Sequence, residues 1–130
     1  MKKILVVDDE FISRTILQKL TSLRGEVQAC SNGLEALEAF VAAAEKGEPF
    51  SLICMDVLMP VMDGVEALRR IREHESSRGI PREAGIKVVM TTGLGEHDSE
   101  LTDVRPLFDT TMTKPFRLQT VIETLASLGH

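Results

Sequence analysis

The segment ICMDVLMPVMDG, from Ile53 to Gly64, is the part of the sequence that decides the fold. Its apolar run stops abruptly at Asp56, and Pro60 and an Asp-Gly pair follow within eight residues. A short apolar run bounded by turn residues is typical of a buried parallel strand. Because parallel sheets bind their ligands at the carboxyl ends of the strands, we expect Asp56 to point into a site.

The same alternation of strand and helix extends along the whole chain. Short runs rich in apolar and β-branched residues predict five strands, and apolar residues at helical spacing predict a helix after each of them. Strands and helices that alternate in this way imply an α/β fold with a parallel sheet covered on both faces. The predicted strands are Lys3–Val7, Glu26–Cys30, Leu52–Met55, Lys87–Thr91 and Phe108–Thr113.

The predicted helices differ in how clearly the sequence marks them. The first is expected to bury an apolar stripe and to end at Gly25. The third is expected to end near His74, and the fourth, Glu96–Val104, has few apolar positions. The stripe of the first helix consists of Ile12, Ile16, Leu20 and Leu23.

Composition limits the class of protein. The 130 residues suit one domain, and 43% hydrophobic residues supply a core. The formal net charge of -5 argues against general nucleic-acid binding. The start MKKILVVDDE places acids where a signal peptide would be cleaved, and no apolar run is long enough to span a membrane, so we expect a cytoplasmic protein. Cys30 and Cys54 are interpreted as buried free thiols.

Charged and hydroxyl side chains follow four of the predicted strands: Asp8 and Asp9, then Asp56, then Thr91 and Thr92, then Lys114. Carboxylates about 4 Å apart repel by roughly 4 kcal/mol at an effective dielectric constant near 20, so three of them need a cation. All-oxygen ligands suit Mg²⁺ (or Mn²⁺). Carboxylate, metal, hydroxyl and ammonium together are the parts of a phosphoryl-transfer site with an aspartate nucleophile. The alternative is a charged rim without chemistry.

Over essentially its full length the chain resembles a response-regulator receiver domain of two-component signalling. Four segments carry the resemblance, in the order expected of a five-stranded receiver: VVDDE, MDVLMPVMDG, VVMTTG and TKPF. The resemblance implies a flavodoxin-like (βα)5 fold, doubly wound, with strand order 2-1-3-4-5. It also implies one receiver domain spanning residues 1–130.

The resemblance implies a role for each matching residue. Asp56 matches the phosphoacceptor, and Asp8 and Asp9 match the acidic pair that holds Mg²⁺ together with Asp56 and the backbone carbonyl of Leu58. Thr92 matches the switch hydroxyl and Lys114 the lysine that pairs with the phosphoryl group. The residues expected to shape the loops are Pro60, Gly64, Gly93 and Pro115, the last after a cis bond.

Two features depart from the usual receiver pattern. Thr111 stands at the position where the family usually has an aromatic switch residue, so the usual coupling of hydroxyl shift to aromatic rotation is not expected. Leu58 and Leu94 are expected to flank the phosphate, and neither can orient an attacking water. We therefore expect slow self-dephosphorylation.

The remaining features favour a particular subtype of receiver or are interpreted as ordinary solvent-exposed surface. The long loop Ser76–Ile86 is similar to that of receivers in hybrid kinases and phosphorelays, and Arg14 is expected near the rim of the site. A basic stretch is interpreted as a solvated helix face. It consists of Arg69, Arg70, Arg72, Arg78 and Arg82.

The resemblance also implies partners. We expect a phosphoryl group from a sensor histidine kinase or a histidine phosphotransfer protein, a downstream target protein, and no direct contact with nucleic acid or membrane. A phosphorylation-dependent dimer is compatible with the family. Three alternatives stay open: a phospho-independent pseudo-receiver, a receiver fragment of a larger regulator or hybrid kinase, and a small metal-dependent phosphatase. The phosphatase would usually carry a second aspartate where this chain has Leu58.

Overall fold

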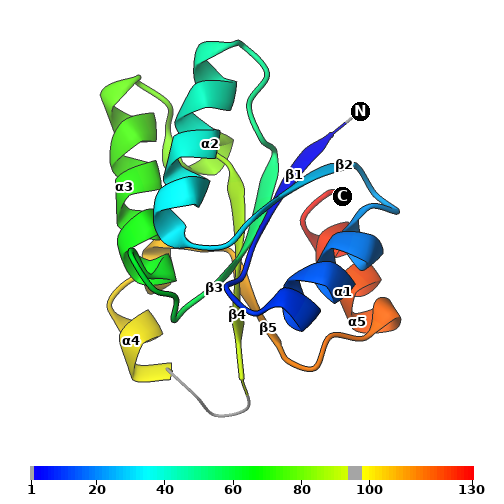
Figure 1. Cartoon of the computed structure of the whole chain (residues 1–130). Coiled ribbons are helices and arrows are strands. Elements are labelled where there is room, and N and C mark those ends of the chain that lie inside the picture. Colours follow the sequence, from blue (N-terminus) through cyan, green and yellow to red (C-terminus); the bar gives the residue numbers. More distant parts are fainter. Residues whose placement is uncertain (1, 94–97) are drawn as a thin grey trace.

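The computed structural model describes residues 2–93 and 98–130 and is built around one five-stranded sheet (Figure 1). All neighbouring strands are parallel, in the order β2-β1-β3-β4-β5. This confirms the predicted flavodoxin-like, doubly wound α/β fold and its strand order. The strands are β1 (Lys3–Val7), β2 (Glu26–Cys30), β3 (Leu52–Asp56), β4 (Lys87–Thr92) and β5 (Thr110–Thr113).

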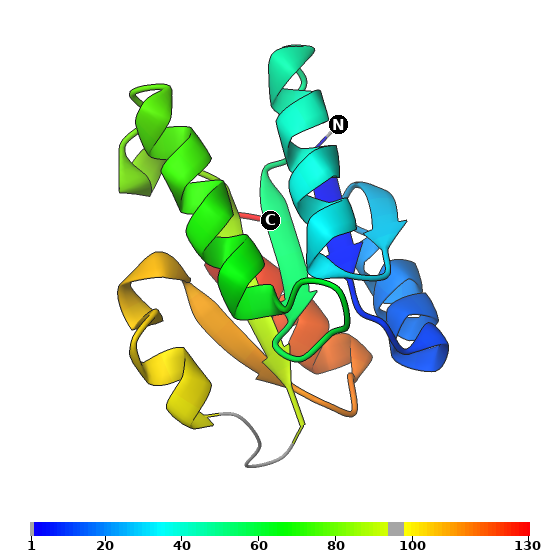
Figure 2. The ribbon, with the colours of Figure 1, turned by 60° about the vertical axis from the view of Figure 1, so that its left-hand side comes forward.

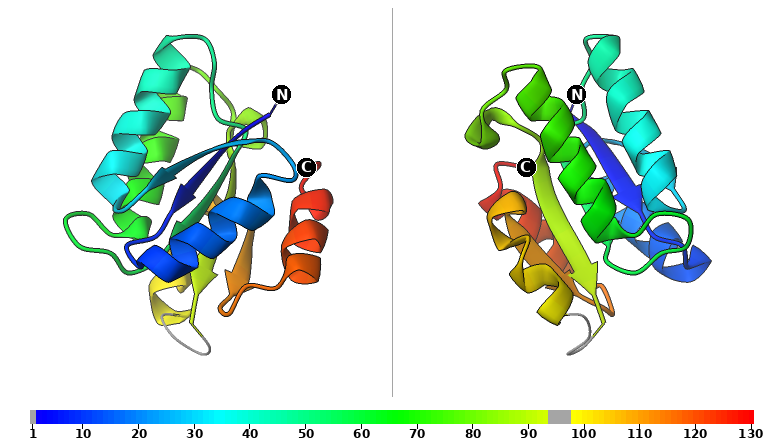
Figure 3. Two further views of the ribbon diagram at one scale, coloured as in Figure 1. Left: turned by 45° about the vertical axis from the view of Figure 1, so that its right-hand side comes forward. Right: turned by 90° about the vertical axis from the view of Figure 1, so that its left-hand side faces the viewer.

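Helices cover both faces of the sheet. On one face α2 and α3 lie side by side, and α4 lies near the β5 edge (Figure 2). On the other face α1 and α5 are neighbours (Figure 3). Within the described residues, no helix is both long and apolar enough to cross a membrane. The helices are α1 (Phe11–Thr21), α2 (Gly33–Glu45), α3 (Gly64–Ser77), α4 (Asp98–Thr102) and α5 (Leu118–Ser127), with 3-10 turns at Arg82–Ala84 and Arg105–Leu107.

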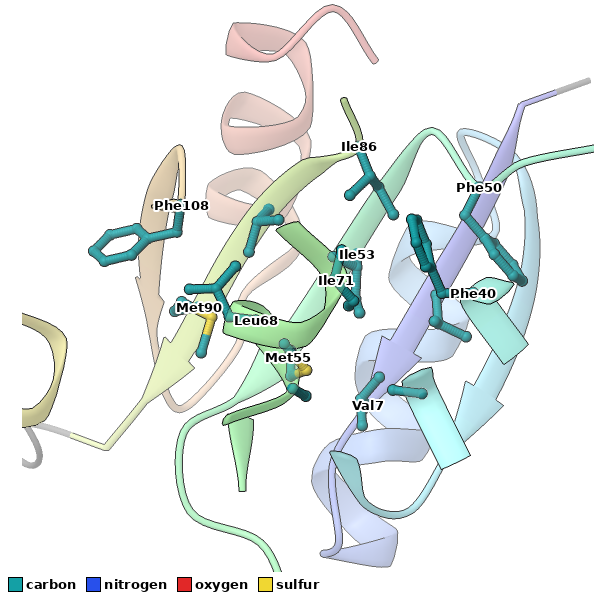
Figure 4. Packing of buried hydrophobic residues seen from close by; sticks show 14 of the residues in the cluster. Val7, Phe40, Phe50, Ile53, Met55, Leu68, Ile71, Ile86, Met90 and Phe108 are labelled. Carbon is teal, nitrogen blue, oxygen red and sulfur yellow. The ribbon is translucent and has the colours of Figure 1, made fainter. Parts of the chain in front are cut away.

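Each face of the sheet has its own hydrophobic core. Side chains alternate along a strand, so Met55 faces α2 and α3 while Cys54 faces α1 and α5. The larger core contains Phe40, Ile53 and Leu68 (Figure 4). Cys30 and Cys54 are buried free thiols, as expected. Burial of both faces explains why the central strands are apolar at nearly every position.

The predicted buried stripe of α1 is wrong at three of its four positions, whereas Leu20 packs against the core. Ile12 is 66% exposed and Ile16 42% exposed, whereas Leu17 is buried. Leu23 lies beyond the end of the helix at Thr21 and is also exposed. Thr21 takes a core position because its hydroxyl donates to the Leu17 carbonyl at 2.8 Å. The helix therefore packs through a less apolar face and leaves an apolar one uncovered.

Several boundaries also differ from the prediction. Helix α3 continues to Ser77, β4 includes Thr92, and β5 begins only at Thr110. Helix α4 ends at Thr102, two residues before the predicted end at Val104, and residues 96 and 97 of the predicted range lie outside the described residues. Helix ends depend on capping and on tertiary contacts, which periodicity does not report.

Arg72 departs most from the predicted solvated helix face, and Arg82 departs as well, since it lies on a 3-10 turn and is 33% exposed. Arg72 shows the larger difference. Its side chain is buried, with Nη1 2.7 Å from Glu75 Oε1 and Nη2 3.8 Å from Asp109 Oδ2. Its Nε also donates to the Leu107 carbonyl at 2.9 Å. Glu75 lies one turn further along α3, and Asp109, which is distant in sequence, immediately precedes β5. Only the fold reveals that this arginine is an internal ion-pair partner.

Candidate functional site

The ends of three strands bring the predicted charged residues together. The carboxylates of Asp8, Asp9 and Asp56 each offer an oxygen, and these atoms lie within 4.8 Å of one another. Lys114 follows β5 and reaches the same place, with Nζ 2.9 Å from Asp8 Oδ2 and 3.4 Å from Asp56 Oδ2. Because β1 and β3 are neighbours, their last residues meet at one edge of the sheet.

Asp8 and Asp9 have different environments, as the alternation of side chains predicts. Asp8 is 0% exposed, while Asp9 is exposed. Asp8 Oδ1 accepts a hydrogen bond from the Glu10 amide at 2.9 Å. Asp8 Oδ2 is buried and accepts no hydrogen bond of good geometry from the described residues, although the Lys114 ammonium is close. A buried carboxylate oxygen that can still act as a ligand, beside two further carboxylates, suits the coordination of a hard divalent cation.

The surroundings of Asp56 disfavour its ionised form. Burial, together with the charge of Asp8, raises the pKa of Asp56 from 3.8 to about 6, although Lys114 opposes the shift. Burial lowers the pKa of Lys114, but its close contacts and charge interactions with Asp8 and Asp56 outweigh this effect and raise it. The excess negative charge is the property that a bound cation would offset.

The loop after β3 is held close to Asp56 by main-chain contacts. The Gly64 amide donates to the Val57 carbonyl at 2.7 Å, and a Cβ on Gly64 would lie 2.0 Å from the Asp56 carbonyl oxygen. Glycine is therefore required at the start of α3. Pro60 and Leu58 are exposed within the loop. Val61 has φ +70°, a conformation that strains a β-branched residue.

The two threonines at the end of β4 face opposite sides of the sheet. Thr91 is the register partner of Asp56, and its buried hydroxyl has no hydrogen-bond partner among the described residues. Thr92 is the register partner of Thr113 and is also buried. Gly93 follows, and Leu94 lies outside the described residues. The roles of these threonines stay predictions.

The remaining predicted positions lie on and after β5. Thr111 is exposed on the edge strand. The bond between Lys114 and Pro115 is cis, as expected. Arg14 lies at the rim, where Nη1 donates to the Asp8 carbonyl at 2.8 Å. Sequence reasoning did not identify Glu10, whose carboxylate accepts from Ser13 Oγ at 2.5 Å at the start of α1. A Glu three residues before a Ser is too common to predict this contact.

Comparison with known proteins agrees with this arrangement. The family described as the response regulator receiver domain matches residues 4–126. The chain therefore belongs to the response regulator receiver family of two-component signalling. Its acidic triad is typical of phosphoacceptor receivers, which are signalling domains rather than classical enzymes.

The relatives include single-domain and multidomain proteins. The chemotaxis protein CheY of Halobacterium salinarum is 29% identical over 98% of this chain and 96% of its own length. The histidine kinase CKI1 of Arabidopsis thaliana is 44% identical over 61% of this chain, which corresponds to 8% of that kinase. The chain thus spans nearly all of one relative and a small part of another.

Solved structures give the same result. A mutant receiver domain of CKI1 superposes with a TM-score of 0.77 at 33% identity, covering 97% of this chain and 89% of that one. The receiver domain of Ssk1 from Saccharomyces cerevisiae was co-crystallised with the histidine phosphotransfer protein Ypd1. That structure matches with a TM-score of 0.81 at 25% identity, covering 98% of this chain and 88% of that one.

Proposed function

We propose that Asp56 is the phosphoacceptor of this receiver. The observation that carries the proposal is the convergence of Asp56 with Asp8, Asp9 and Lys114 at the carboxyl edge of the sheet. In the transfer, an Asp56 carboxylate oxygen attacks the phosphorus of a phosphohistidine. The phosphorus–nitrogen bond breaks, its electron pair returns to the imidazole, and an acyl phosphate forms on Asp56.

Asp8, Asp9 and Asp56, with the backbone carbonyl of Leu58, would hold Mg²⁺ (or Mn²⁺). When bound, the cation neutralises the carboxylates and the incoming phosphoryl oxygens. Support comes from the clustering of the three carboxylates, which one lysine does not neutralise, and from the raised pKa of Asp56. Manganese would use the same oxygen ligands.

The protein's own side chains complete the proposed site. Lys114, already paired with Asp8 and Asp56, would turn toward the phosphoryl oxygens, and Thr92 would donate its hydroxyl to them. Pro60, Gly64, Gly93 and Pro115 shape the loops around this position. For Gly64 the reason is its close approach to the Asp56 carbonyl.

A test is the intact mass of the protein after incubation with acetyl phosphate and Mg²⁺. We expect one phosphoryl adduct that depends on Mg²⁺ and is missing in Asp56→Asn. The absence of an adduct, with the fold retained, would favour a phospho-independent pseudo-receiver. An adduct that persists in Asp56→Asn would place the phosphoacceptor elsewhere.

The donor is proposed to be a sensor histidine kinase or a histidine phosphotransfer protein that docks on α1. Phe11, Ile12 and Ile16 are exposed on α1, the helix that begins directly after the acidic residues, and Leu118 is exposed at the start of α5, the neighbour of α1 (Figure 3). An uncovered apolar patch beside a reactive side chain is suited to a helical partner. The Ssk1 receiver domain, which was co-crystallised with Ypd1, is a structural relative with this fold.

Docking can be separated from chemistry by a pair of charge substitutions. Ile12→Asp should slow phosphotransfer from a phosphorylated histidine phosphotransfer protein by about tenfold or more, since apolar contacts at the centre of an interface dominate its energy. Leu23→Asp replaces an equally exposed residue beyond the other end of α1 and should have little effect. Both variants should still react with acetyl phosphate. Equal transfer rates for the two variants would argue against α1 as the docking surface.

The output would be a change in protein binding. Thr111 replaces the usual aromatic residue on β5, so the signal would pass through the main chain of β4 and β5 to a downstream target or to a phosphorylation-dependent dimer. The proposal concerns the domain and applies equally to a single-domain regulator and to a receiver within a larger protein.

A further inference from the structure

A cavity of about 390 Å³ opens at the edge of the sheet opposite Asp56. It lies between α2, the last turns of α3 and the loop that leads into β4. Phe40, Phe50 and Ile86 form its floor and are each 4% exposed. Figure 4 shows these three side chains together at one end of the larger core. The His74 ring stands edge-on to Phe40 at 5.6 Å, so the wall is aromatic as well.

Cations surround this aromatic floor. Arg78 and Lys87 line the cavity, and neither forms an ion pair within the described part of the chain. Lys3 Nζ lies 4.8 Å from the centroid of the Phe50 ring. The positive field reaches His130, whose pKa is lowered by burial and further by nearby lysines that include Lys87. In a chain with net charge -5, this is a local excess of positive charge.

The acids of the cavity compensate these cations only in part. Glu75 lines the wall, but its carboxylate is engaged at 2.7 Å by Arg72 and at 2.7 Å by the Ile86 amide. Glu83 is the other acidic side chain in the lining, and it is exposed on a 3-10 turn. Two unpaired cations therefore face one solvated acid.

The walls of the cavity are held in place before any ligand arrives. A Cβ on Gly85 would lie 2.4 Å from Glu75 Oε1, so the loop packs directly on that carboxylate. On its far side the loop is held by Arg82, whose Nε donates to the Pro106 carbonyl at 3.0 Å and whose Nη2 lies 3.5 Å from Asp109. A preformed site loses less entropy on binding than a flexible one.

We propose that this cavity binds a planar aromatic carboxylate. The ring would fill the cavity against the edges of Phe40 and Phe50 that remain accessible, and the carboxylate would meet Arg78 and Lys87 at the rim. Ligand sites of this size are mostly apolar with a few charged groups that fix orientation, which is the composition found here. Inorganic phosphate would leave the aromatic floor of the cavity uncovered. An uncharged aromatic compound would leave Arg78 and Lys87 without a counter-ion.

The test uses naphthoate as the probe and its uncharged amide, naphthamide, as a matched compound of the same shape. In amide nitrogen–proton correlation spectra of the unphosphorylated protein, naphthoate should give saturable shifts at Gly85, Ile86 and Lys87. Naphthamide should bind about fivefold more weakly, because it cannot form the two exposed ion pairs and these together contribute about that much to affinity. Equal affinity for both compounds, or shifts confined to other regions, would overturn the proposal.

Variants locate the binding. The double change Arg78→Gln and Lys87→Gln should reduce naphthoate affinity to that of naphthamide, whereas Arg69→Gln, an exposed arginine outside the cavity, should leave it unchanged. Ala84→Phe adds a ring at an exposed lining position and should block both compounds. If Ala84→Phe leaves naphthoate binding intact in a folded protein, the proposal is wrong. Phosphorylation of Asp56 takes no part in these measurements, so their outcome is independent of the proposed function.

Discussion

Replacement of Asp56 by Asn should stabilise the metal-free protein at neutral pH. The pKa of Asp56 is raised from 3.8 to about 6, mainly by burial and by the charge of Asp8. A raised carboxyl pKa means that the folded state binds the proton more tightly than the unfolded state. The stabilisation from this proton is therefore fully present below about pH 4 and is lost as the pH rises through about 6. Asn imitates the protonated carboxyl at every pH.

The magnitude follows from the same shift. The difference between about 6 and 3.8 corresponds to about 3 kcal/mol at 1.36 kcal/mol per pH unit. The Asp56 side chain is 13% exposed, and water screens part of the unfavourable field. We therefore expect Asp56→Asn to raise the free energy of unfolding by about 1 to 2 kcal/mol at about pH 7.5 in EDTA, with a difference near zero at about pH 4.

Urea denaturation followed by far-ultraviolet circular dichroism is the suitable assay, because the chain has no Trp and no Tyr for fluorescence. Asp103→Asn, at an exposed surface position, is the control and should stay within about 0.5 kcal/mol of the unmodified protein. Added Mg²⁺ should stabilise the unmodified protein more than Asp56→Asn, since a ligand of the native state raises its stability by mass action. Two results would refute the electrostatic reasoning. One is an Asp56→Asn variant that is no more stable than its parent in EDTA, and the other is a stabilisation that is the same at about pH 7.5 and about pH 4.

Further predictions concern the loops and the strand beside Asp56. Val61→Gly should stabilise the protein by about 0.5 to 1 kcal/mol in urea denaturation, because Val61 is 77% exposed and has a positive φ; a loss of stability would show that its side chain matters more than the strain. Thr91→Val should be stabilising by about 1 kcal/mol because its buried hydroxyl has no partner among the described residues, whereas Thr21→Val should be destabilising because that hydroxyl is hydrogen-bonded; the same sign for both would contradict this. Gly64→Ala should destabilise by more than about 2 kcal/mol in the same assay and slow acetyl phosphate labelling, unless α3 can shift away from Asp56. Because Leu58 is apolar and cannot orient water, the phosphorylated form should decay slowly by mass spectrometry and Leu58→Asn should speed its decay; fast decay of the unmodified protein would contradict the expectation.

The sequence by itself determined the elements of the fold and the composition of the site. Strands such as Leu52–Asp56 are apolar at nearly every position because both faces of a parallel sheet are buried, and this pattern is readable locally. The convergence of Asp8, Asp56 and Lys114 also follows from the sequence, since parallel strands place their carboxyl ends at one edge. Local pattern and topology agree at this site, which made the prediction possible.

Tertiary structure decided what depends on contacts between distant segments. Helix α1 carries two apolar sets at helical spacing, and only packing against the sheet and α5 determines that Leu17 is buried while Ile12 faces outward. Arg72 became an internal ion-pair partner because Asp109, far along the chain, lies next to α3. The cavity above Phe40 and the strained turn at Val61 arise in the same way. Periodicity records which residues can share a face, but the choice between faces is made by the packing free energy of the whole domain.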